Sequence, residues 1–584
     1  MAAPATPRRQ EPRETDIITP EEMLRFLSFV DQLDMEADAS LPLSSPNALY
    51  RMSIYLLRQH LEGKAVTITA LAAASGVPYA TAMRRIDDMI ENGLVVRRPK
   101  GRQRKTFSLH PGPALIAAWY GYARRFKRII GRTFGFSYDR EDFDYYFGGS
   151  YLSARIVPPP GVLSVKLPIT GPLRLLVHAD PTFMAMENLK RRFEQYVGVP
   201  FRVRALSIDR LREEGLLNAQ LSRSRYDIIA CDLPWIGEFA VKTILRPLDE
   251  MIAAADINVA DFHPAGWKGA HYRGRPYGFP IHTTAELLLY RKDLFAEREI
   301  APPATTDEVL AAARLLHQPH KSGLRGIAWN AARGTPMGHT FIMVLAAFGR
   351  PVLNLRRVGH NFDAETIEGE QFRPMINSIE ARGTAEYLRE LMQYSPTNIL
   401  TMSWYERMAA YSRGEVAMAY GYNLYASYFE LDDTSPAKGH TGILPHPAGR
   451  GGRNIAPVGG FVLGLPANLV EDRVEAAWQA LRFLTSSEAI KLFVLNGSRT
   501  SPRFSVSADP EVRSLSPAIT AVDEMERSGL VQFWPRPPAP EIAEIINICG
   551  EEMHDMARGT KSVNAALAAA QDRADRLMRS KGYY

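Results

Sequence analysis

The chain has 584 residues, of which 46% are hydrophobic and 23% are charged. This ordinary globular composition excludes a wholly disordered, collagenous or coiled-coil protein, and at roughly 100–200 residues per domain it predicts about three folding units. Two cysteines without a Cys-x-x-Cys pair exclude a disulfide framework and a cysteine-type zinc site.

The net charge of +6 is unevenly distributed along the chain. Residues 1–40 carry four Lys/Arg and nine Asp/Glu, a net charge of −5. Residues 41–135 carry sixteen and four, a net charge of +12, and residues 136–584 carry fifty and fifty-one, a net charge of −1. All the excess positive charge therefore lies in one stretch, which is typical of a nucleic-acid-binding module attached to a neutral protein.

The first 40 residues are predicted to form a polar arm followed by a helix. Thr19 caps this helix, Pro20 occupies its first position, and two glutamates follow. No apolar core follows the arginines of the arm, so it does not resemble a secretory signal. No run of about 18 apolar residues occurs anywhere, so no membrane span is predicted. We therefore expect a cytoplasmic protein.

Residues 41–135 are predicted to form a small helical module with a basic hairpin. Helical spacing covers residues 47–62, a short helix runs from Thr67 to near Gly76, and a further helix covers residues 79–91. The segment LVVRRPKGRQRKTFSLH then predicts two strands around a basic tip, and a helix follows near residues 113–130.

This order, and the segment ITALAAASGVPYATAMRRIDDMIENGLVVRRPKGRQRKTFSL, resemble the winged helix–turn–helix of MarR-type regulators. The resemblance implies binding to double-stranded DNA, with a recognition helix in the major groove and a wing on phosphate or in the minor groove. The residues expected to contact DNA are Tyr79, Thr81, Ala82, Arg84 and Arg85 on the helix, and Arg97, Arg98, Lys100, Arg102, Arg104 and Lys105 on the wing.

Two alternatives stay open for this basic module. It could serve only as a protein-docking module with a solvated charged surface, although eight basic against three acidic residues across 79–105 favour DNA. The resemblance also implies a homodimer through residues 19–36 and 113–130. The basic side chains of the second segment could equally contact phosphate.

From residue 136 the character of the chain changes twice. Residues 136–169 are rich in Tyr, Phe, Gly and Pro and are interpreted as a connector. Then LRLLVHA, FRVRALS and YDIIACD read as buried strands separated by helices near residues 183–197 and 208–221. This alternation predicts an α/β fold with right-handed crossovers.

Residues 170–584 resemble the family 1 extracellular solute-binding proteins of ABC sugar importers. The resemblance rests on YDIIACDLPWIGEFA, YRGRPYGFPIHTTAELLLYRKDLF, GEVAMAYGYNLYAS and VGGFVLGLPANLVEDRVEAAWQALRFLTSSEAIKLF. It implies a two-lobed α/β fold of periplasmic-binding-protein type II, with crossovers near residues 280 and 455 and a ligand between the lobes. The overall expectation is thus an α+β winged helix followed by this fold.

The resemblance implies that residues at matching positions contact the ligand, with aromatic faces stacked on sugars and polar groups bound to hydroxyls. The residues are Asp180, Asp232, Trp235, Tyr422, Gly460 and Arg503, with Thr283, Trp329, Met337 and Trp404 as weaker candidates. Each also has a structural interpretation: Asp180 could cap a helix, Trp235 and Trp329 could be core, and Gly460 could permit a tight turn.

An enzyme is not expected, because no nucleophile-elbow, Walker, zincin or dinucleotide motif occurs. No cofactor and no metal are expected; His263, His271 and His282 match no metal-ligand spacing. Together the two resemblances predict a cytoplasmic, ligand-responsive transcriptional regulator that senses a small molecule, expected to be a carbohydrate. The alternative is the substrate-binding component of an ABC sugar importer, with its permease as partner and an atypical N-terminal module.

Overall fold

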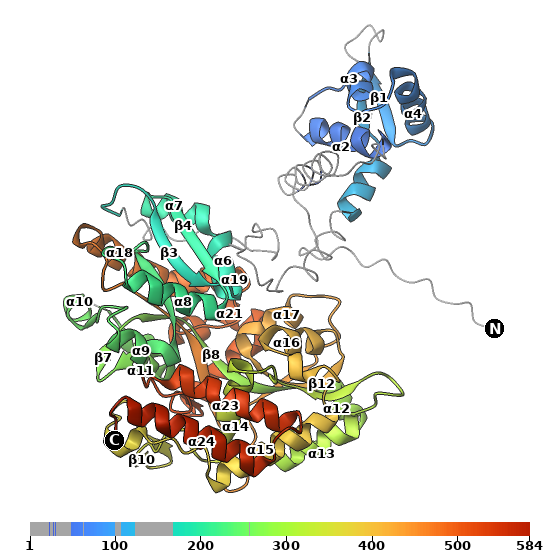
Figure 1. Ribbon diagram of the computed structural model, residues 1–584. Coiled ribbons are helices and arrows are strands. Elements are labelled where there is room, and N and C mark those ends of the chain that lie inside the picture. Colours follow the sequence, from blue (N-terminus) through green and yellow to red (C-terminus); the bar gives the residue numbers. More distant parts are fainter. Residues whose placement is uncertain are drawn as a thin grey trace. The chain divides into compact units, whose positions relative to one another are not determined.

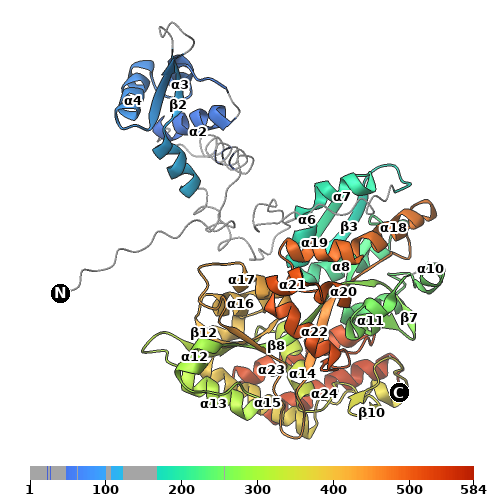
Figure 2. The ribbon, with the colours of Figure 1, turned by 180° about the vertical axis from the view of Figure 1, so that it is seen from behind.

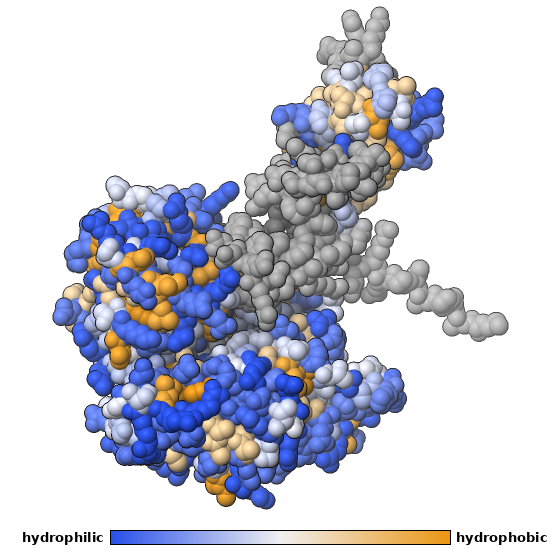
Figure 3. Space-filling model, viewed as in Figure 1, coloured by the Kyte–Doolittle hydropathy of each residue, from blue (hydrophilic) through white to orange (hydrophobic). Residues whose placement is uncertain are grey.

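The computed structural model describes residues 23, 27, 30, 48–61, 64–99, 107–122, 167–255 and 257–584. The chain divides into two compact units, Met1–Ser137 and Tyr138–Tyr584. Within the described residues no helix is long and apolar enough to cross a membrane. The face drawn in Figure 3 is mostly hydrophilic, with hydrophobic residues in small separate groups.

Between residues 48 and 111, the described part of the N-terminal unit contains three helices followed by an antiparallel hairpin (Figure 1). The elements are α2 (Ala48–Leu61), α3 (Ile68–Ala73), α4 (Tyr79–Glu91), β1 (Val95–Pro99) and β2 (Phe107–Pro111), and residues 113–122 are also helical. Gly76 adopts a left-handed conformation (φ +70°) in the turn between α3 and α4, which glycine accepts without strain. The core of this unit includes Leu71, Ala82, Ile86 and Trp119.

The large unit is built on one continuous mixed sheet with the strand order β4-β3-β5-β14-β8-β12-β9, with β13 beside β8 and β15 beside β14. Continuous apolar runs such as IIACD in β5 are buried on both faces, as in parallel sheets covered by helices. The strands are β3 (Leu173–His178), β4 (Phe201–Leu206), β5 (Ile228–Asp232), β8 (Phe279–Arg291), β9 (Arg325–Ala328), β12 (Val416–Tyr422), β13 (Thr441–Leu444), β14 (Ala456–Gly464) and β15 (Val531–Gln532).

Two long strands divide this sheet into two lobes. The first half of β8 pairs with β14, whereas its second half, from Glu286 onward, pairs with β12 and β13. The end of β14 pairs with β5, and its start pairs with β15. We call the part around β3, β4 and β5 the first lobe and the part around β9, β12 and β13 the second lobe. A third connection, near residues 499–503, runs beside β8, because the Thr500 hydroxyl donates to the Thr283 carbonyl.

Helices cover both faces of the sheet (Figures 1 and 2). In the first half of the unit they are α6 (Pro181–Asn188), α7 (Lys190–Val197), α8 (Ile208–Ala219), α9 (Ile236–Val241), α10 (Asp249–Ala253), α11 (Pro264–Gly269), α12 (Lys292–Glu297), α13 (Thr306–Leu316), α14 (Thr335–Ala347) and α15 (Ile379–Leu391). In the second half they are α16 (Trp404–Ser412), α17 (Ser427–Glu430), α18 (Glu471–Leu484), α19 (Ser487–Leu495), α20 (Phe504–Ser507), α21 (Pro510–Leu515), α22 (Pro517–Arg527), α23 (Ile542–Ala557) and α24 (Val563–Ser580).

One predicted helix differs from the structure. The segment expected to be helical over residues 183–197 starts earlier, at Pro181, and is divided into α6 and α7 at Leu189. The early start has a local cause: the Asp180 carboxylate accepts hydrogen bonds from the amides of Thr182 and Phe183 and so caps α6. Short 3-10 turns η3 (Leu233–Trp235), η4 (Val259–Asp261) and η8 (Asn423–Ala426) also follow or connect these elements.

Candidate functional site

The carboxyl ends of strands from both lobes converge where β14 crosses between them. Asp232 ends β5 and is the register partner of Phe461 in β14. Tyr422 ends β12, on the neighbouring strand to β8. Polar groups gathered at the carboxyl ends of α/β strands form the usual ligand site of open sheets. Two of the predicted ligand residues are therefore at this place in the fold.

A buried arginine connects the groups at this point. Arg536 donates from Nη2 to the Val458 carbonyl of β14 at 2.6 Å. Its Nη1 lies 3.2 Å from Nδ1 of His339 on α14 and 3.9 Å from Oδ2 of Asp232. One guanidinium thus contacts the first lobe, the second lobe and the strand between them. Neither Arg536 nor His339 was predicted from the sequence.

Gly459 allows this close packing. A Cβ atom at this position would lie 2.7 Å from the Tyr422 ring and 3.1 Å from Nη2 of Arg536. Both distances are shorter than ordinary contacts, so a side chain here would displace the phenol and the guanidinium. Glycine at residue 459 is therefore required for the site as it is built.

Burial and neighbouring charge set the protonation of these groups. Burial raises the pKa of Asp232, and the Arg536 charge partly opposes this shift. Burial, together with Arg536 and Arg407, holds the pKa of His339 well below its usual value. Burial also raises the pKa of the Tyr422 phenol. His339 and Tyr422 are consequently neutral at pH 7, so the site presents uncharged hydrogen-bonding groups around the Asp232–Arg536 pair.

Two tryptophan rings lie near the polar groups Asp232 and His339. The Trp404 ring lies 5.8 Å from the His339 ring, edge to face, and Trp404 is partly exposed. Trp235 follows Asp232 in η3 and meets the Phe461 ring at 6.2 Å, edge to face. Trp404 begins α16 and lies beside His339, whereas Trp235 is buried among core residues and also stacks on the Phe239 ring at 5.9 Å.

Two further buried side chains, not predicted from the sequence, have polar atoms without partners in the described part of the chain. Asn330, fully buried, follows β9, which runs parallel to β12, and neither of its side-chain amide atoms has a hydrogen-bond partner among the described residues. The indole nitrogen of Trp534 is likewise unpaired and buried. A polar residue after the apolar strand GIAW was the available signal for Asn330. Nothing periodic marks Trp534 and Arg536, which lie in a proline-rich loop.

Two of the weaker candidates belong to the core, and their predicted ligand contacts are corrected here. Trp329 is fully buried and its indole N–H donates to the Ser395 hydroxyl at 2.9 Å. Met337 is fully buried within α14. A tryptophan whose single donor is satisfied inside the protein has no polar atom left for a ligand. The core interpretation of Trp329 is confirmed.

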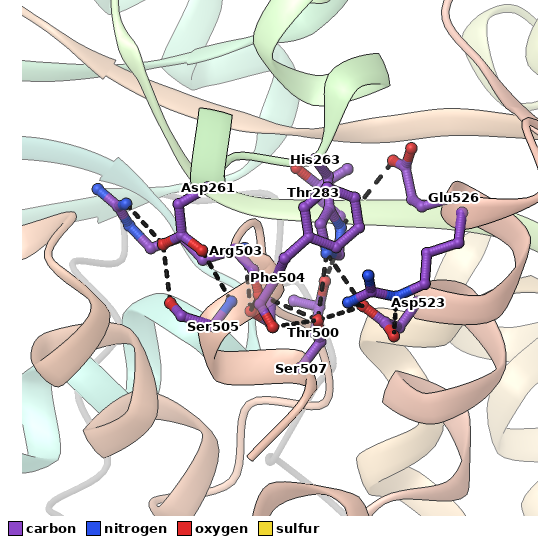
Figure 4. Close-up of polar contacts among 12 residues, drawn as sticks. Asp261, His263, Thr283, Thr500, Arg503, Phe504, Ser505, Ser507, Asp523 and Glu526 are labelled. Atoms are coloured by element: carbon purple, nitrogen blue, oxygen red, sulfur yellow. Dashed lines mark hydrogen bonds and ion pairs between the residues drawn. The ribbon is translucent and has the colours of Figure 1, made fainter. Parts of the chain in front are cut away.

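Arg503 serves the structure rather than the site, and Thr283 is buried in the same region (Figure 4). Arg503 pairs with Asp261 at 3.0 Å, donates to the Thr485 carbonyl, and lies over the Phe262 ring at 3.9 Å. Thr283 is fully buried, its side chain lies against Gly266, and its carbonyl accepts from Thr500 of the third connection. The predicted ligand contact of Arg503 is wrong, because its guanidinium is already occupied within the protein. The Thr283 hydroxyl has no hydrogen-bond partner among the described residues, so its contact with ligand stays a prediction.

Asp180 and Gly460 need the same correction. Asp180 is fully buried, caps α6 and bonds the imidazoles of His178 and His282, so the capping interpretation is confirmed. Gly460 has φ +129°, and a Cβ there would lie 2.3 Å from the His282 carbonyl oxygen. Gly460 lies within β14 and packs against β8 beside an irregularity in the β14 register, so it is a strand residue and the tight-turn interpretation is wrong.

In the N-terminal unit, the predicted DNA-contacting residues fall into three groups. Tyr79, Thr81, Arg84 and Arg85 are exposed on α4, and Arg97 and Arg98 are exposed on β1. Ala82 is fully buried in the core, so its predicted contact with a base is wrong. Lys100, Arg102, Arg104 and Lys105 lie outside the described residues. Of the two segments predicted to form the dimer, most of 19–36 and residues 123–130 of the second also lie outside them.

Arg97 is held by its neighbours on the same unit. Its guanidinium lies 3.6 Å from the Asp87 carboxylate and 4.8 Å from the centre of the Phe107 ring. The acidic residues Asp87, Asp88 and Glu91 occupy the second half of α4, so the positive charge of this helix is confined to its first half.

Metal binding has no support in the described part of the chain, where no three His, Cys, Asp or Glu side chains are grouped to hold an ion. The three histidines noted in the sequence have separate partners. His263 faces α22, His271 bonds the Trp267 carbonyl, and His282 bonds Asp180. Cys231 and Cys549 are buried and unpaired.

Three comparisons bear on the large unit. A 22% identity to the mannitol-binding protein of Pseudomonas aeruginosa extends over 420 residues, 68% of this chain and 91% of that protein. A 31% identity to the maltotriose-binding protein of Pyrococcus abyssi extends over 140 residues, 24% of this chain and only 28% of that protein. The solved structure of an ABC transporter solute-binding protein from Agrobacterium radiobacter, in complex with ribitol, matches 70% of this chain and 100% of its own with a TM-score of 0.65 and 24% identity.

The structural similarity establishes the two-lobed type II periplasmic-binding-protein fold that was predicted for the large unit. The profile of the family described as "Bacterial extracellular solute-binding protein" matches residues 181–491, more than half of the chain. This family consists of binding proteins, which confirms that the chain is not an enzyme. The chain belongs to the bacterial extracellular solute-binding protein family.

Proposed function

We propose that the large unit binds a neutral sugar or sugar alcohol between its two lobes. The observation that supports this proposal is that Arg536 contacts both Asp232 of the first lobe and His339 of the second lobe, beside aromatic rings. Asp232 and Arg536 offset each other, and His339 is neutral at pH 7. A ligand without net charge suits such a site, because a charged one would be buried without a counter-ion.

The names of the relatives support this ligand class. Mannitol, maltotriose and ribitol appear in the three matched proteins, and all are neutral polyhydroxylated molecules. Hydroxyl groups both donate and accept, which matches the mixture of carboxylate, guanidinium, imidazole and amide at the site. Aromatic faces such as Trp404 would pack on the apolar faces of the ligand, and closing of the lobes would remove it from water.

The test is a thermal-shift and calorimetry screen of the full chain with D-mannitol, ribitol and maltotriose, with D-glucuronate as the charged comparison. A ligand at about 100 times its Kd adds about 2.7 kcal/mol to the folded state, so a bound probe raises Tm. Arg536→Met is expected to abolish the shift, whereas Arg513→Met, exposed on α21, keeps it. A stronger response to glucuronate than to every neutral probe would contradict the proposed class.

Family membership supports the role of substrate-binding component of an ABC importer, which delivers its ligand to a permease. The second candidate is a cytoplasmic ligand-responsive transcriptional regulator that acts as a homodimer. The specific observation in its favour is α4: it follows a tight turn after α3 and exposes Tyr79, Thr81, Arg84 and Arg85 on one helix. These side chain types suit base edges in a major groove.

Cell fractionation and DNA binding separate the two roles. Recovery in the periplasm would support import, whereas recovery in the cytoplasm together with selection of a defined duplex from random DNA would support regulation. In that case Arg84→Ala with Arg85→Ala is expected to weaken binding to the selected duplex by more than tenfold, since each good base contact is worth about 1–3 kcal/mol. Arg210→Ala with Arg223→Ala on the large unit is the matched control. Equal retention of DNA by both double variants would exclude the regulator.

A further inference from the structure

The Asp180 carboxylate is fully buried at the end of β3 and has no capacity left for a ligand. Oδ1 accepts from the amides of Thr182 and Phe183 at 2.8 and 3.1 Å. Oδ2 lies 3.1 Å from both His178 Nδ1 and His282 Nε2. Burial alone would raise the pKa of Asp180, but the two histidines outweigh it and hold the pKa below its usual range. The group is therefore ionised and fully used within the protein.

The imidazoles of His178 and His282 both contact the Phe461 ring of β14. The His178 imidazole stacks on Phe461 with a centroid distance of 4.9 Å and an interplanar angle of 11°. The His282 ring lies 5.5 Å from the same ring at 51°. Phe461 follows Gly460 at the point where the β14 register shifts, so its strand alone does not hold it in a regular ladder. The two imidazoles, together with the Phe183 ring that meets Phe461 edge to face at 6.2 Å, supply that restraint.

Phe461 in turn meets the tryptophan of the ligand site. Its ring is perpendicular to Trp235 at 6.2 Å, and its backbone is opposite Asp232. Edge-to-face aromatic pairs of this kind fix the orientation of both rings. A continuous series of contacts thus runs from Asp180 through the imidazoles and Phe461 to Trp235.

We propose that Asp180 is a positioning residue of the ligand site: through His178 and His282 it fixes Phe461, and through Phe461 it fixes the orientation of Trp235. The inference rests on the proposed function, since it takes Trp235 as a ring that packs on the ligand. Without the carboxylate, the imidazoles lose their shared acceptor and the two aromatic rings gain rotamers. The ligand must then order both rings when it binds, which weakens affinity.

Fluorine NMR of the full chain labelled with fluorotryptophan tests this directly, with the Trp235 resonance assigned by Trp235→Phe. Asp180→Asn and His178→Ala are expected to shift or broaden the Trp235 resonance and to weaken binding of D-mannitol or ribitol about tenfold, the cost of ordering two side chains. His178→Phe preserves the stacked ring without the bond to Asp180. Because its ring has no bond to Asp180, His178→Phe is expected to shift or broaden the Trp235 resonance as Asp180→Asn does.

Asp227→Asn is the matched control, because Asp227 is equally buried in the first lobe but pairs with Arg174 and Arg473 before the start of β5. It is expected to lower stability and leave the Trp235 resonance and the affinity unchanged. If Asp180→Asn does not fold, the pair His178→Ala and His178→Phe decides.

The proposal is overturned if Asp180→Asn or His178→Ala leaves the Trp235 resonance unchanged. It is also overturned if His178→Phe restores the wild-type resonance, because stacking on Phe461 would then suffice without the bond to Asp180. Loss of affinity with an unchanged resonance would instead make Asp180 a direct ligand contact, which also refutes it. Failure of the wild-type protein to bind any probe refutes the proposed function. In that case the Trp235 resonance, compared between the ligand-free wild type and Asp180→Asn, still tests whether Asp180 positions Trp235.

Discussion

Glu526 on α22 is a carboxyl group buried against His263 at the start of α11, and its replacement by Gln tests how burial sets charge at this contact (Figure 4). Its Oε1 lies 3.9 Å from His263 Nδ1, and neither atom has a hydrogen-bond partner in the part of the chain that the structure describes. Burial, with the nearby Asp523 carboxylate adding to it, raises the pKa of Glu526 to about 8. Asp523 itself is held by Ser507, Arg513 and Arg527.

The sign and size of the effect follow from linkage. A carboxyl group whose folded-state pKa is raised binds its proton more tightly when folded, so its contribution to stability is lost as pH rises from its ordinary value of 4.5 to about 8. At 1.36 kcal/mol per pH unit, this loss amounts to about 4 kcal/mol between pH 5 and pH 8. Gln cannot ionise, so Glu526→Gln is expected to gain about that much stability over the wild type across this interval.

Urea denaturation of the full chain, followed by intrinsic tryptophan fluorescence from pH 5 to pH 8, measures the difference. His263, whose pKa burial lowers to about 4, is present in both proteins, so its contribution cancels. Glu524→Gln on the exposed face of the same helix is the matched control and is expected to follow the wild-type profile. A stability difference between Glu526→Gln and wild type that does not change with pH would refute the argument.

Three further predictions concern the corrected and the missed residues. Trp329→Phe is expected to lose about 1 kcal/mol of stability with its bond to Ser395 while binding D-mannitol or ribitol as the wild type does; weakened binding would return Trp329 to the site. Asn330→Leu, of similar volume, is expected to abolish binding of the same probe in calorimetry without lowering Tm; unchanged binding would place Asn330 in the core. Gly460→Ala is expected to lower Tm more than Gly559→Ala does, because both residues have positive φ but only the first meets backbone, at His282; equal losses would show that strain alone matters.

The sequence determined the elements of the large unit and some positions at the ends of its strands. Apolar runs such as IIACD need burial on both faces, so strands and covering helices follow from composition and spacing. Because ligands bind at carboxyl strand ends, Asp232 at the end of β5 and Tyr422 at the end of β12 could be selected without coordinates. The exposed residues of α4 could be found in the same way, since helical spacing separates them from the buried face.

Only the tertiary structure decided which polar groups are already satisfied. Asp180, Trp329 and Arg503 have the side chains expected of ligand residues, but His282, Ser395 and Asp261, each distant in sequence, occupy their hydrogen-bonding atoms. Ala82 lies in the predicted recognition helix, yet packing turns it to the core.

Arg536 and Asn330 are the opposite case, because no sequence pattern marks them as ligand residues. Arg536 lies in a loop without periodic pattern, and Asn330 is one polar residue after a strand. Their position depends on the sheet closing across both lobes, which brings Arg536 to Asp232 and His339. Local propensity acts over neighbouring residues, whereas partners of a buried charge are chosen by the whole fold, because leaving such a charge unpaired costs more than any local preference supplies.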